Sequence, residues 1–201
     1  MNIRSRRFSG LRPVCIGEFG IPFDMDNKSS YSSPYSFKNQ SVALDTNLSA
    51  MEHNLVNYCL WNYSPDCSHE WGDGNGWNDE DLSIFCADDG NQDSLYLGAR
   101  CSDVFIRPHA SLIAGTSLKV SYTGLKPVPW VLEYECTNLE WTVVYVPEWG
   151  AWSDRSRVKV DVICSVRSEF EWHEHELRVR VHIPDGEKRS VTLRVYGDGV
   201  K

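Results

Sequence analysis

The stretch Val14-Cys15-Ile16-Gly17-Glu18-Phe19-Gly20 says most about the fold of this chain. It begins as a short apolar run of the kind that is buried on both faces of a parallel sheet. Its carboxylate, Glu18, follows that run directly and is therefore expected at the carboxyl edge of the sheet, where α/β proteins build their sites. Because burial of an unpaired carboxylate is costly, Glu18 should have either a chemical task or a cationic partner.

A helix and a second strand are predicted after this run. Residues 37–57 carry one apolar stripe, at steps of four, three and four: Leu44, Leu48, Met51 and Leu55. The run 58–63 then has the character of another buried strand, so the order strand, helix, strand predicts a parallel crossover. Trp61, near the end of the second strand, should present an aromatic face at the same edge as Glu18.

Residues 64–81 form a long segment rich in Gly, Asp, Asn and Trp. Irregular segments of this length inside a compact domain are usually functional or disordered, and Trp71 and Trp77 favour function. A further short helix is predicted between residues 93 and 104.

The second half of the chain alternates apolar and polar residues, which is typical of antiparallel strands with one solvated face. Six such runs are evident: 118–123, 131–136, 142–146, 158–166, 177–183 and 191–196. Six or seven strands at this spacing indicate a β-sandwich. We therefore predict an α/β domain over residues 1–101 and an all-β domain over residues 102–201.

Length and charge exclude several classes of protein. A complete (β/α)8 barrel needs about 250 residues, whereas this chain has 201. The net charge of −8, without a basic stripe, argues against nucleic acid and anionic membranes as partners. No apolar run is long enough for a transmembrane segment. The basic start lacks a following apolar region, so a cytoplasmic location is expected, with a short mitochondrial presequence as the alternative.

Seven cysteines occur without a Cys-x-x-Cys pair, which favours reduced, mostly buried thiols over a disulfide framework or a zinc knuckle. Cys67 and Cys86 could pair in an oxidising compartment. The run 173–176, His-Glu-His-Glu, precedes an alternating strand and lacks a third ligand, so a solvated hairpin turn is favoured over a metal site.

Several motifs resemble glycoside hydrolase family 5, in particular the fungal glucosylceramidases and steryl-β-glucosidases related to endoglycoceramidases. The matching stretches are Val14–Met25, Leu60–Asp66, His69–Gly74 and Trp77–Asp81. Arg107-Pro108-His109 resembles the entry to the C-terminal sandwich of that group, although a Tyr is expected where His109 stands. The resemblance implies the C-terminal remnant of a TIM barrel, namely its strands seven and eight, followed by the antiparallel β-sandwich.

The same resemblance implies residue roles. Glu18 would be the nucleophile of a retaining β-glucosidase, and Trp61 would be the stacking platform for glucose. Trp77, Asp79 and Glu80 would contact the sugar or the aglycone, and neither a metal nor another cofactor is implied.

The acid/base of this family lies in an Asn-Glu-Pro motif, which this sequence does not contain. The chain is therefore expected to be a fragment of an enzyme that hydrolyses glucosylceramide or steryl β-glucosides. It should be inactive alone and would need the N-terminal half of the barrel as its partner. The alternative is a non-catalytic module, in which the sandwich binds a glycan or a partner protein and the barrel piece is vestigial.

Overall fold

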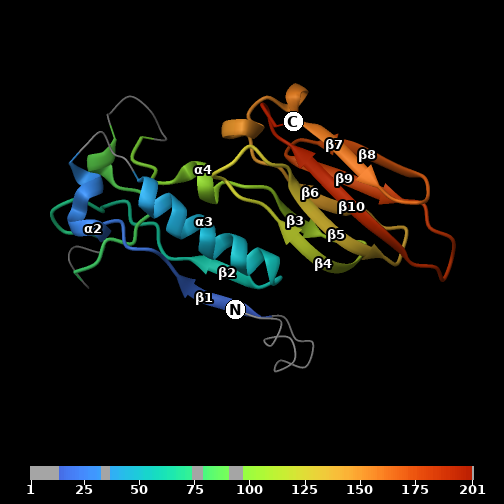
Figure 1. Ribbon diagram of the computed structural model, residues 1–201, viewed down its shortest axis with the longest axis horizontal. Coiled ribbons are helices and arrows are strands. Elements are labelled where there is room, and N and C mark those ends of the chain that lie inside the picture. The colour runs from blue at the N-terminus through green and yellow to red at the C-terminus, as the bar shows by residue number, and fades with distance from the viewer. Residues whose placement is uncertain (1–13, 33–36, 74–78, 91–96, 201) are drawn as a thin grey trace. The chain divides into compact units, whose positions relative to one another are not determined.

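The computed structural model describes residues 14–32, 37–73, 79–90 and 97–200 (Figure 1). Within them the chain forms two compact units, which we describe separately. The N-terminal unit comprises the described residues of Arg4–Leu48 and Val56–Phe105, and the C-terminal unit those of Ile106–Lys201 together with Ser49–Leu55. A domain boundary between residues 101 and 102 stays a prediction.

The N-terminal unit contains a parallel pair of strands, β1 (Cys15–Phe19) and β2 (Asn57–Leu60). Cys15 pairs with Asn57 and Phe19 with Leu60, with one irregularity between these two positions. The helix α3 (Lys38–His53) lies between them in sequence, so the predicted strand–helix–strand crossover is present (Figure 1). The parallel register brings the carboxyl ends of both strands to one edge of the sheet.

Burial on both faces of these strands, in contrast, was predicted wrongly. The side of β1 that carries Cys15 is exposed, whereas Ile16 and Phe19 are half-buried. Cys59 of β2 is exposed as well, so these two thiols are exceptions among cysteines that were predicted to be mostly buried. Within the described residues this sheet has only two strands, so it lacks the second covering layer that buries both faces of a larger parallel sheet.

The helix α3 is shorter than its apolar stripe predicted. Leu44, Leu48 and Met51 are buried, as the 3.6-residue period requires. The helix ends at His53 because the chain turns soon afterwards, with Leu55 in the left-handed region at φ 52°. Leu55 therefore lies outside the helix, although the sequence predicted it as the last residue of the apolar stripe.

The remaining helical elements of this unit are short: α2 (Met25–Lys28), η1 (Ser29–Tyr31), η2 (Ala87–Asp89) and α4 (Ser102–Phe105). The helix predicted between residues 93 and 104 appears only as α4, and residues 91–96 lie outside the described part. None of the described helices is both long and apolar enough to cross a bilayer.

The C-terminal unit consists of two four-stranded sheets in which all neighbouring strands are antiparallel. One sheet has the order β4-β5-β10-β7, with strands Gly115–Ser121, Trp130–Cys136, Arg189–Tyr196 and Lys159–Ile163. The other has the order β3-β6-β9-β8, with strands His109–Leu112, Thr142–Tyr145, Glu176–Val181 and Ser168–His173. The short turns η3 (Gly150–Trp152) and η4 (Arg155–Arg157) precede β7.

Both sheets contribute to one hydrophobic core. Alternate residues of β5, such as Trp130 and Leu132, are fully buried. Leu177 and Val179 of β9 belong to the same cluster as Leu193 of β10. Since a β-strand presents every second side chain to one face, the period of two in the sequence produces this shared core.

The two strands that the alternation did not count, β3 and β8, are the two edges of one sheet. Leu112 and Phe170 on these strands are exposed, as are Leu118 and Ile163 on β4 and β7, the edges of the other sheet. At the other end of β8, His173 pairs with Glu176, so Glu174 and His175 form the turn of the β8–β9 hairpin. Both are exposed, which agrees with the predicted solvated turn.

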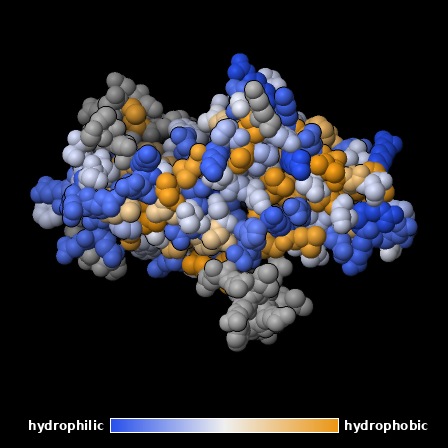
Figure 2. All heavy atoms as spheres, viewed as in Figure 1, coloured by the Kyte–Doolittle hydropathy of each residue, from blue (hydrophilic) through white to orange (hydrophobic). Residues whose placement is uncertain are grey.

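The surface of the C-terminal unit mixes hydrophilic and hydrophobic side chains, on the face shown in Figure 2. Its exposed large hydrophobic residues are Leu112, Leu118, Leu125, Leu139, Ile163 and Phe170. Leu118 of β4 is 56% exposed, whereas Leu193 of β10 is 0% exposed. The two leucines therefore allow the same substitution to be compared on the surface and in the core.

We expect Leu193→Ala to lower the free energy of unfolding by about 2–5 kcal/mol, because it leaves a cavity in the shared core. The matched control Leu118→Ala should change it by less than about 0.5 kcal/mol. Urea unfolding of the two variants measures both values. Equal losses in the two variants would mean that the core is not where the two sheets place it.

Candidate functional site

Glu18 and Trp61 lie at the same edge of the parallel pair. The backbone N–H of Trp61 donates to the carbonyl oxygen of Phe19 at 2.7 Å, directly after Glu18. A Cβ atom at Gly20 would lie 2.3 Å from the Trp61 carbonyl oxygen, so only glycine fits at this position. The sequence-based placement of both residues at this edge therefore agrees with the strand register.

The environment of Glu18 differs from the expectation. Its side chain is exposed, and no described residue makes a hydrogen bond or ion pair with its carboxylate. The cost of a buried, unpaired charge therefore does not arise in this chain. Trp61 is 38% exposed, so its indole presents a surface to solvent rather than filling a core.

The segment that follows Trp61 is held by backbone and side-chain hydrogen bonds. Asn62 exchanges backbone hydrogen bonds with Leu82 and Ile84, at 3.1 and 2.9 Å. The Asn62 side-chain amide also donates to the carboxylate of Asp73, which is buried. These contacts tie Asp73, within the segment 64–81, and the residues just after that segment to the carboxyl end of β2.

The segment 64–81 folds back on itself. Ser68 and Gly72 pair as an isolated bridge, and Gly72 has φ +66° with no room for a Cβ beside the Glu80 carbonyl. Asp79 and Glu80 are exposed next to this turn, and Trp71 is exposed as well. Trp77 lies outside the described residues, so the structure brings together only part of the predicted contact set.

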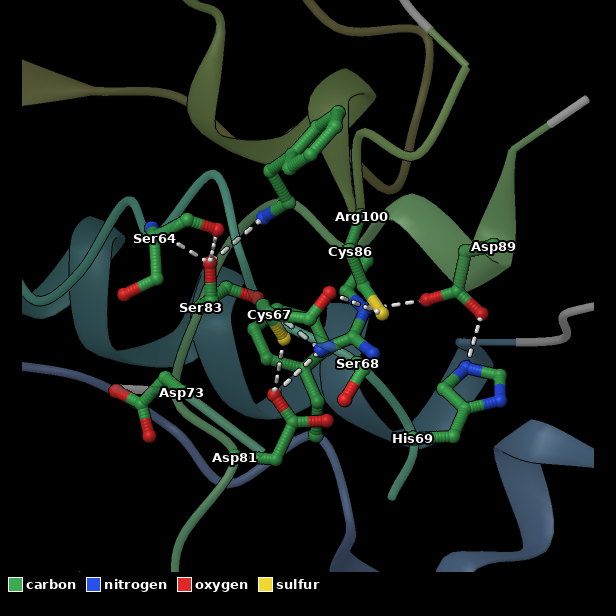
Figure 3. Close-up of polar contacts among 12 residues, drawn as sticks. Ser64, Cys67, Ser68, His69, Asp73, Asp81, Ser83, Cys86, Asp89 and Arg100 are labelled. Atoms are coloured by element: carbon green, nitrogen blue, oxygen red, sulfur yellow. Dashed lines mark hydrogen bonds and ion pairs between the residues drawn. The ribbon is translucent and has the colours of Figure 1, made fainter. Parts of the chain in front are cut away.

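The guanidinium of Arg100 is fully buried and makes polar contacts with several residues of this part of the chain (Figure 3). Its Nη1 atom donates to Asp81 at 2.6 Å, and its Nε atom donates to Asp89. Burial alone would lower the pKa of Arg100, but the hydrogen bonds and charges of these two carboxylates raise it, so the side chain stays charged. The rings of Phe23 and Phe37 lie 5.0 and 5.6 Å from the guanidinium carbon.

Tyr31 and His69 complete one side of this cluster. The Tyr31 hydroxyl donates to Asp81, and burial together with that carboxylate raises the pKa of Tyr31. The rings of Tyr31 and His69 stack at 4.1 Å with an angle of 4°. The Nε2 atom of His69 lies 2.6 Å from Asp89 Oδ1, and the backbone N–H of His69 donates to Asp88 at 2.8 Å.

Two buried cysteines lie beside the guanidinium. Both Cys67 and Cys86 are free thiols, and Cys67 contacts Asp81 Oδ1 at 3.4 Å. A hydrogen bond from Cys67 outweighs burial and, with the nearby Arg100 charge, lowers the pKa of Cys86 to about 7. The same hydrogen bond and burial raise the pKa of Cys67.

Within the described residues, the ligand atoms of His69, Cys86 and Asp89 lie within 4.8 Å of one another and could hold a metal ion. In the sequence, His69 and Cys86 stood out separately, whereas Asp89 and Arg100 were not among the predicted site residues. No local pattern marks these two, because their partners lie 11 and 19 residues apart in the sequence. The acidic runs 79–81 and 88–89 are a local signal that would be compatible with a cation nearby, but they do not identify Arg100 as that cation.

Comparison with known proteins shows relatives among fungal glycosidases. No family model matches the chain. A glucosylceramidase of Rhizopus delemar is 30% identical over 189 residues, which cover 84% of this chain and 27% of that protein. An ergosteryl-β-glucosidase of Saccharomyces cerevisiae is 46% identical over 77 residues, or 38% of this chain and 10% of that protein. A crystal structure of Cryptococcus neoformans sterylglucosidase 1 matches 98% of this chain and 33% of its own, with a TM-score of 0.78 and 24% identity.

These matches define the class: the chain is related to fungal enzymes that cleave β-glucosides, and it corresponds to their C-terminal part. More narrowly, it is related to the glucosylceramidases and steryl-β-glucosidases, which confirms the resemblance seen in the sequence motifs. The chain spans about a third or less of the length of these relatives.

We expect Arg100→Met to lower the free energy of unfolding by about 3–5 kcal/mol, because it leaves two buried carboxylates without their cation. Arg157 is the matched control, since it also pairs with two aspartates, Asp154 and Asp198, but is exposed. Arg157→Met should leave stability unchanged within error, because solvent screens exposed pairs. Chemical denaturation of both variants tests this, and an Arg100→Met protein as stable as the control would contradict it.

Proposed function

We propose that this chain carries the nucleophile half of the active site of a retaining β-glucosidase that acts on glucosylated lipids. The observation that carries the proposal is the position of Glu18 and Trp61 at one edge of a parallel strand pair. The names of the relatives support the substrate class, since they are a glucosylceramidase and an ergosteryl-β-glucosidase.

At the level of fold, β1, α3 and β2 would be part of the last two strand–helix units of a TIM barrel. In such barrels the carboxyl ends of the strands carry the catalytic residues. The two antiparallel sheets would be the C-terminal β-sandwich that follows the barrel, with the boundary near residues 101 and 102. The likeness in fold to the Cryptococcus sterylglucosidase supports this division.

The chemistry proposed for Glu18 is nucleophilic attack on the anomeric carbon of glucose, which forms a glycosyl ester and releases the lipid alcohol. A retaining mechanism needs a second carboxyl group about 5–5.5 Å away, which first protonates the leaving oxygen and then activates water. The exposure of Glu18 is compatible with this role, because the attacking oxygen must reach the substrate. The 201 residues contain no Asn-Glu-Pro motif, so a different segment would supply the acid/base.

Trp61 would be the floor of the glucose subsite. Its exposed indole could pack against the C–H face of the sugar ring, and the hydrogen bonds of Asn62 hold its backbone in place. Asp79 and Glu80, with Trp77, would contact the sugar or the aglycone from the neighbouring turn. Their role rests on the resemblance of the motif Trp77–Asp81 and on the exposure of the two carboxylates.

The 201-residue chain, assayed by itself, should hydrolyse no aryl or lipid β-glucoside above background. The reason is that general acid–base catalysis contributes about 10²–10⁴-fold to the rate, and this chain has no candidate for the acid/base residue. Release of a fluorescent aglycone measures the activity. A measurable turnover that disappears in Glu18→Gln would contradict this expectation.

A chimera tests the assignment of Glu18 directly. An intact relative would supply barrel strands one to six with the acid/base, and this chain would supply the rest. A 2-deoxy-2-fluoro glucosyl fluoride should then trap a glycosyl ester, because the fluorine at C2 slows both steps while the good leaving group allows the first. Mass spectrometry should find the label on Glu18. A label on Glu70 or Glu80 in an active chimera would show that the nucleophile was misassigned.

In the same chimera, Trp61→Ala should lower kcat/KM. The reason is that the lost stacking on glucose weakens transition-state binding by on the order of 1–3 kcal/mol. Trp71→Ala, which removes another exposed indole from the neighbouring turn, is the matched control and should have the smaller effect. Steady-state kinetics with a soluble β-glucoside gives both values. An unaffected Trp61→Ala chimera would leave this side chain without a role in substrate binding.

A further inference from the structure

We propose that His69, Cys86 and Asp89 form a binding site for a zinc ion. An imidazole nitrogen, a thiol sulfur and a carboxylate oxygen lie within 4.8 Å of one another. In a tetrahedral zinc site with Zn–N and Zn–O bonds near 2.0 Å and a Zn–S bond near 2.3 Å, such atoms are roughly 3.3–3.5 Å apart. Small side-chain shifts would therefore bring all three into coordination.

The type of ligand selects the metal. Calcium and magnesium prefer shells made of oxygen atoms, whereas a mixture of thiolate, imidazole and carboxylate suits zinc. Three protein ligands also leave the fourth tetrahedral position for water. The proposal does not depend on the role of Glu18, since none of the three residues belongs to the predicted catalytic set.

The local backbone brings these ligands together. Cys86 is the residue that precedes the 3-10 helix η2, and Asp89 is its last residue. Because a 3-10 helix has three residues per turn, positions i and i+3 lie on the same side of it. His69 approaches from the turn closed by the Ser68–Gly72 bridge, and its Nε2 atom lies 2.6 Å from Asp89 Oδ1. Zinc would replace this direct contact, and the two atoms would move apart by about 0.7 Å to share the ion.

A second layer of contacts orients two of the ligands, as is usual around protein-bound zinc. The other oxygen of Asp89 accepts a hydrogen bond from Arg100 Nε. The ring of His69 is held in plane by the parallel ring of Tyr31 at 4.1 Å. Figure 3 shows Arg100, Cys86 and Asp89 converging, with His69 beyond Asp89.

The charges also favour a cation. Two buried carboxylates, Asp81 and Asp89, face the single guanidinium of Arg100, which leaves one negative charge. Asp88, which accepts from the His69 backbone, adds another. A zinc ion with a Cys86 thiolate would contribute one net positive charge and thus offset half of this excess. A protonated His69 could do the same, so the rival explanation is a purely structural ion pair.

The experiment uses the whole chain, stripped of metal and kept in a reductant that does not bind metals. Competition with a chromophoric chelator measures zinc affinity, and cobalt(II) serves as a spectroscopic probe. We expect one zinc ion per chain and a thiolate-to-cobalt charge-transfer band. Cys86→Ser should abolish that band and weaken zinc binding by more than the roughly 10–100-fold that loss of an outer-shell partner costs.

His69→Gln is the second variant, in case Cys86→Ser does not fold, and it should weaken zinc binding to a similar degree. The double variant Cys15→Ser/Cys59→Ser removes two exposed thiols of the same unit and is the control, with unchanged affinity expected. Zinc should raise the thermal midpoint of the wild-type chain but not that of Cys86→Ser. The proposal is wrong if the wild-type chain binds no zinc, if Cys86→Ser and His69→Gln bind like wild type, or if affinity is lost in the Cys15/Cys59 variant.

Discussion

The ion cluster around Arg100 is the interaction on which the N-terminal unit depends most. Burying a guanidinium costs several kcal/mol unless its charge and its N–H groups are satisfied. Here Asp81, Asp89 and the Ser83 carbonyl provide partners from three points along one segment. Because the charge is stabilised only when these groups meet, the cluster fixes the course of a chain segment that has little regular secondary structure.

That same segment borders the candidate site. The backbone N–H of Phe23, after β1, donates to the Asp81 carbonyl, and Asn62, after β2, pairs with Leu82 and Ile84. The ends of both strands are thus tied to residues next to the buried ions. A zinc ion bound by His69, Cys86 and Asp89 would crosslink this segment further. The geometry of the sheet edge and the stability of the ion cluster are therefore linked through a few hydrogen bonds.

The C-terminal unit is stabilised by different means. Its two sheets bury an apolar core with residues such as Trp130, Leu177 and Leu193. Most of its ion pairs, for example Lys188 with Glu135, lie at exposed or half-exposed positions where solvent screening makes them weak. The pair of Arg107 with Glu52 is a buried exception. Hydrophobic patterning therefore predicts this unit well, whereas specific polar contacts decide the N-terminal one.

The sequence by itself determined what depends on local periodicity and composition. The stripe of Leu44, Leu48 and Met51 predicted α3, the period of two predicted six of the eight described strands of the C-terminal unit, and the motifs around Glu18 and Trp61 identified the relatives. Tertiary structure decided the rest. The strands β3 and β8 carry few apolar residues, Ala110 and Leu112 in one and Phe170 and Trp172 in the other, so they leave a weak pattern in the sequence. The exposure of Cys15 and Glu18 depends on how many strands join the sheet, and the partners of Arg100 are chosen by the folded chain, because ionic contacts between distant residues follow no local period.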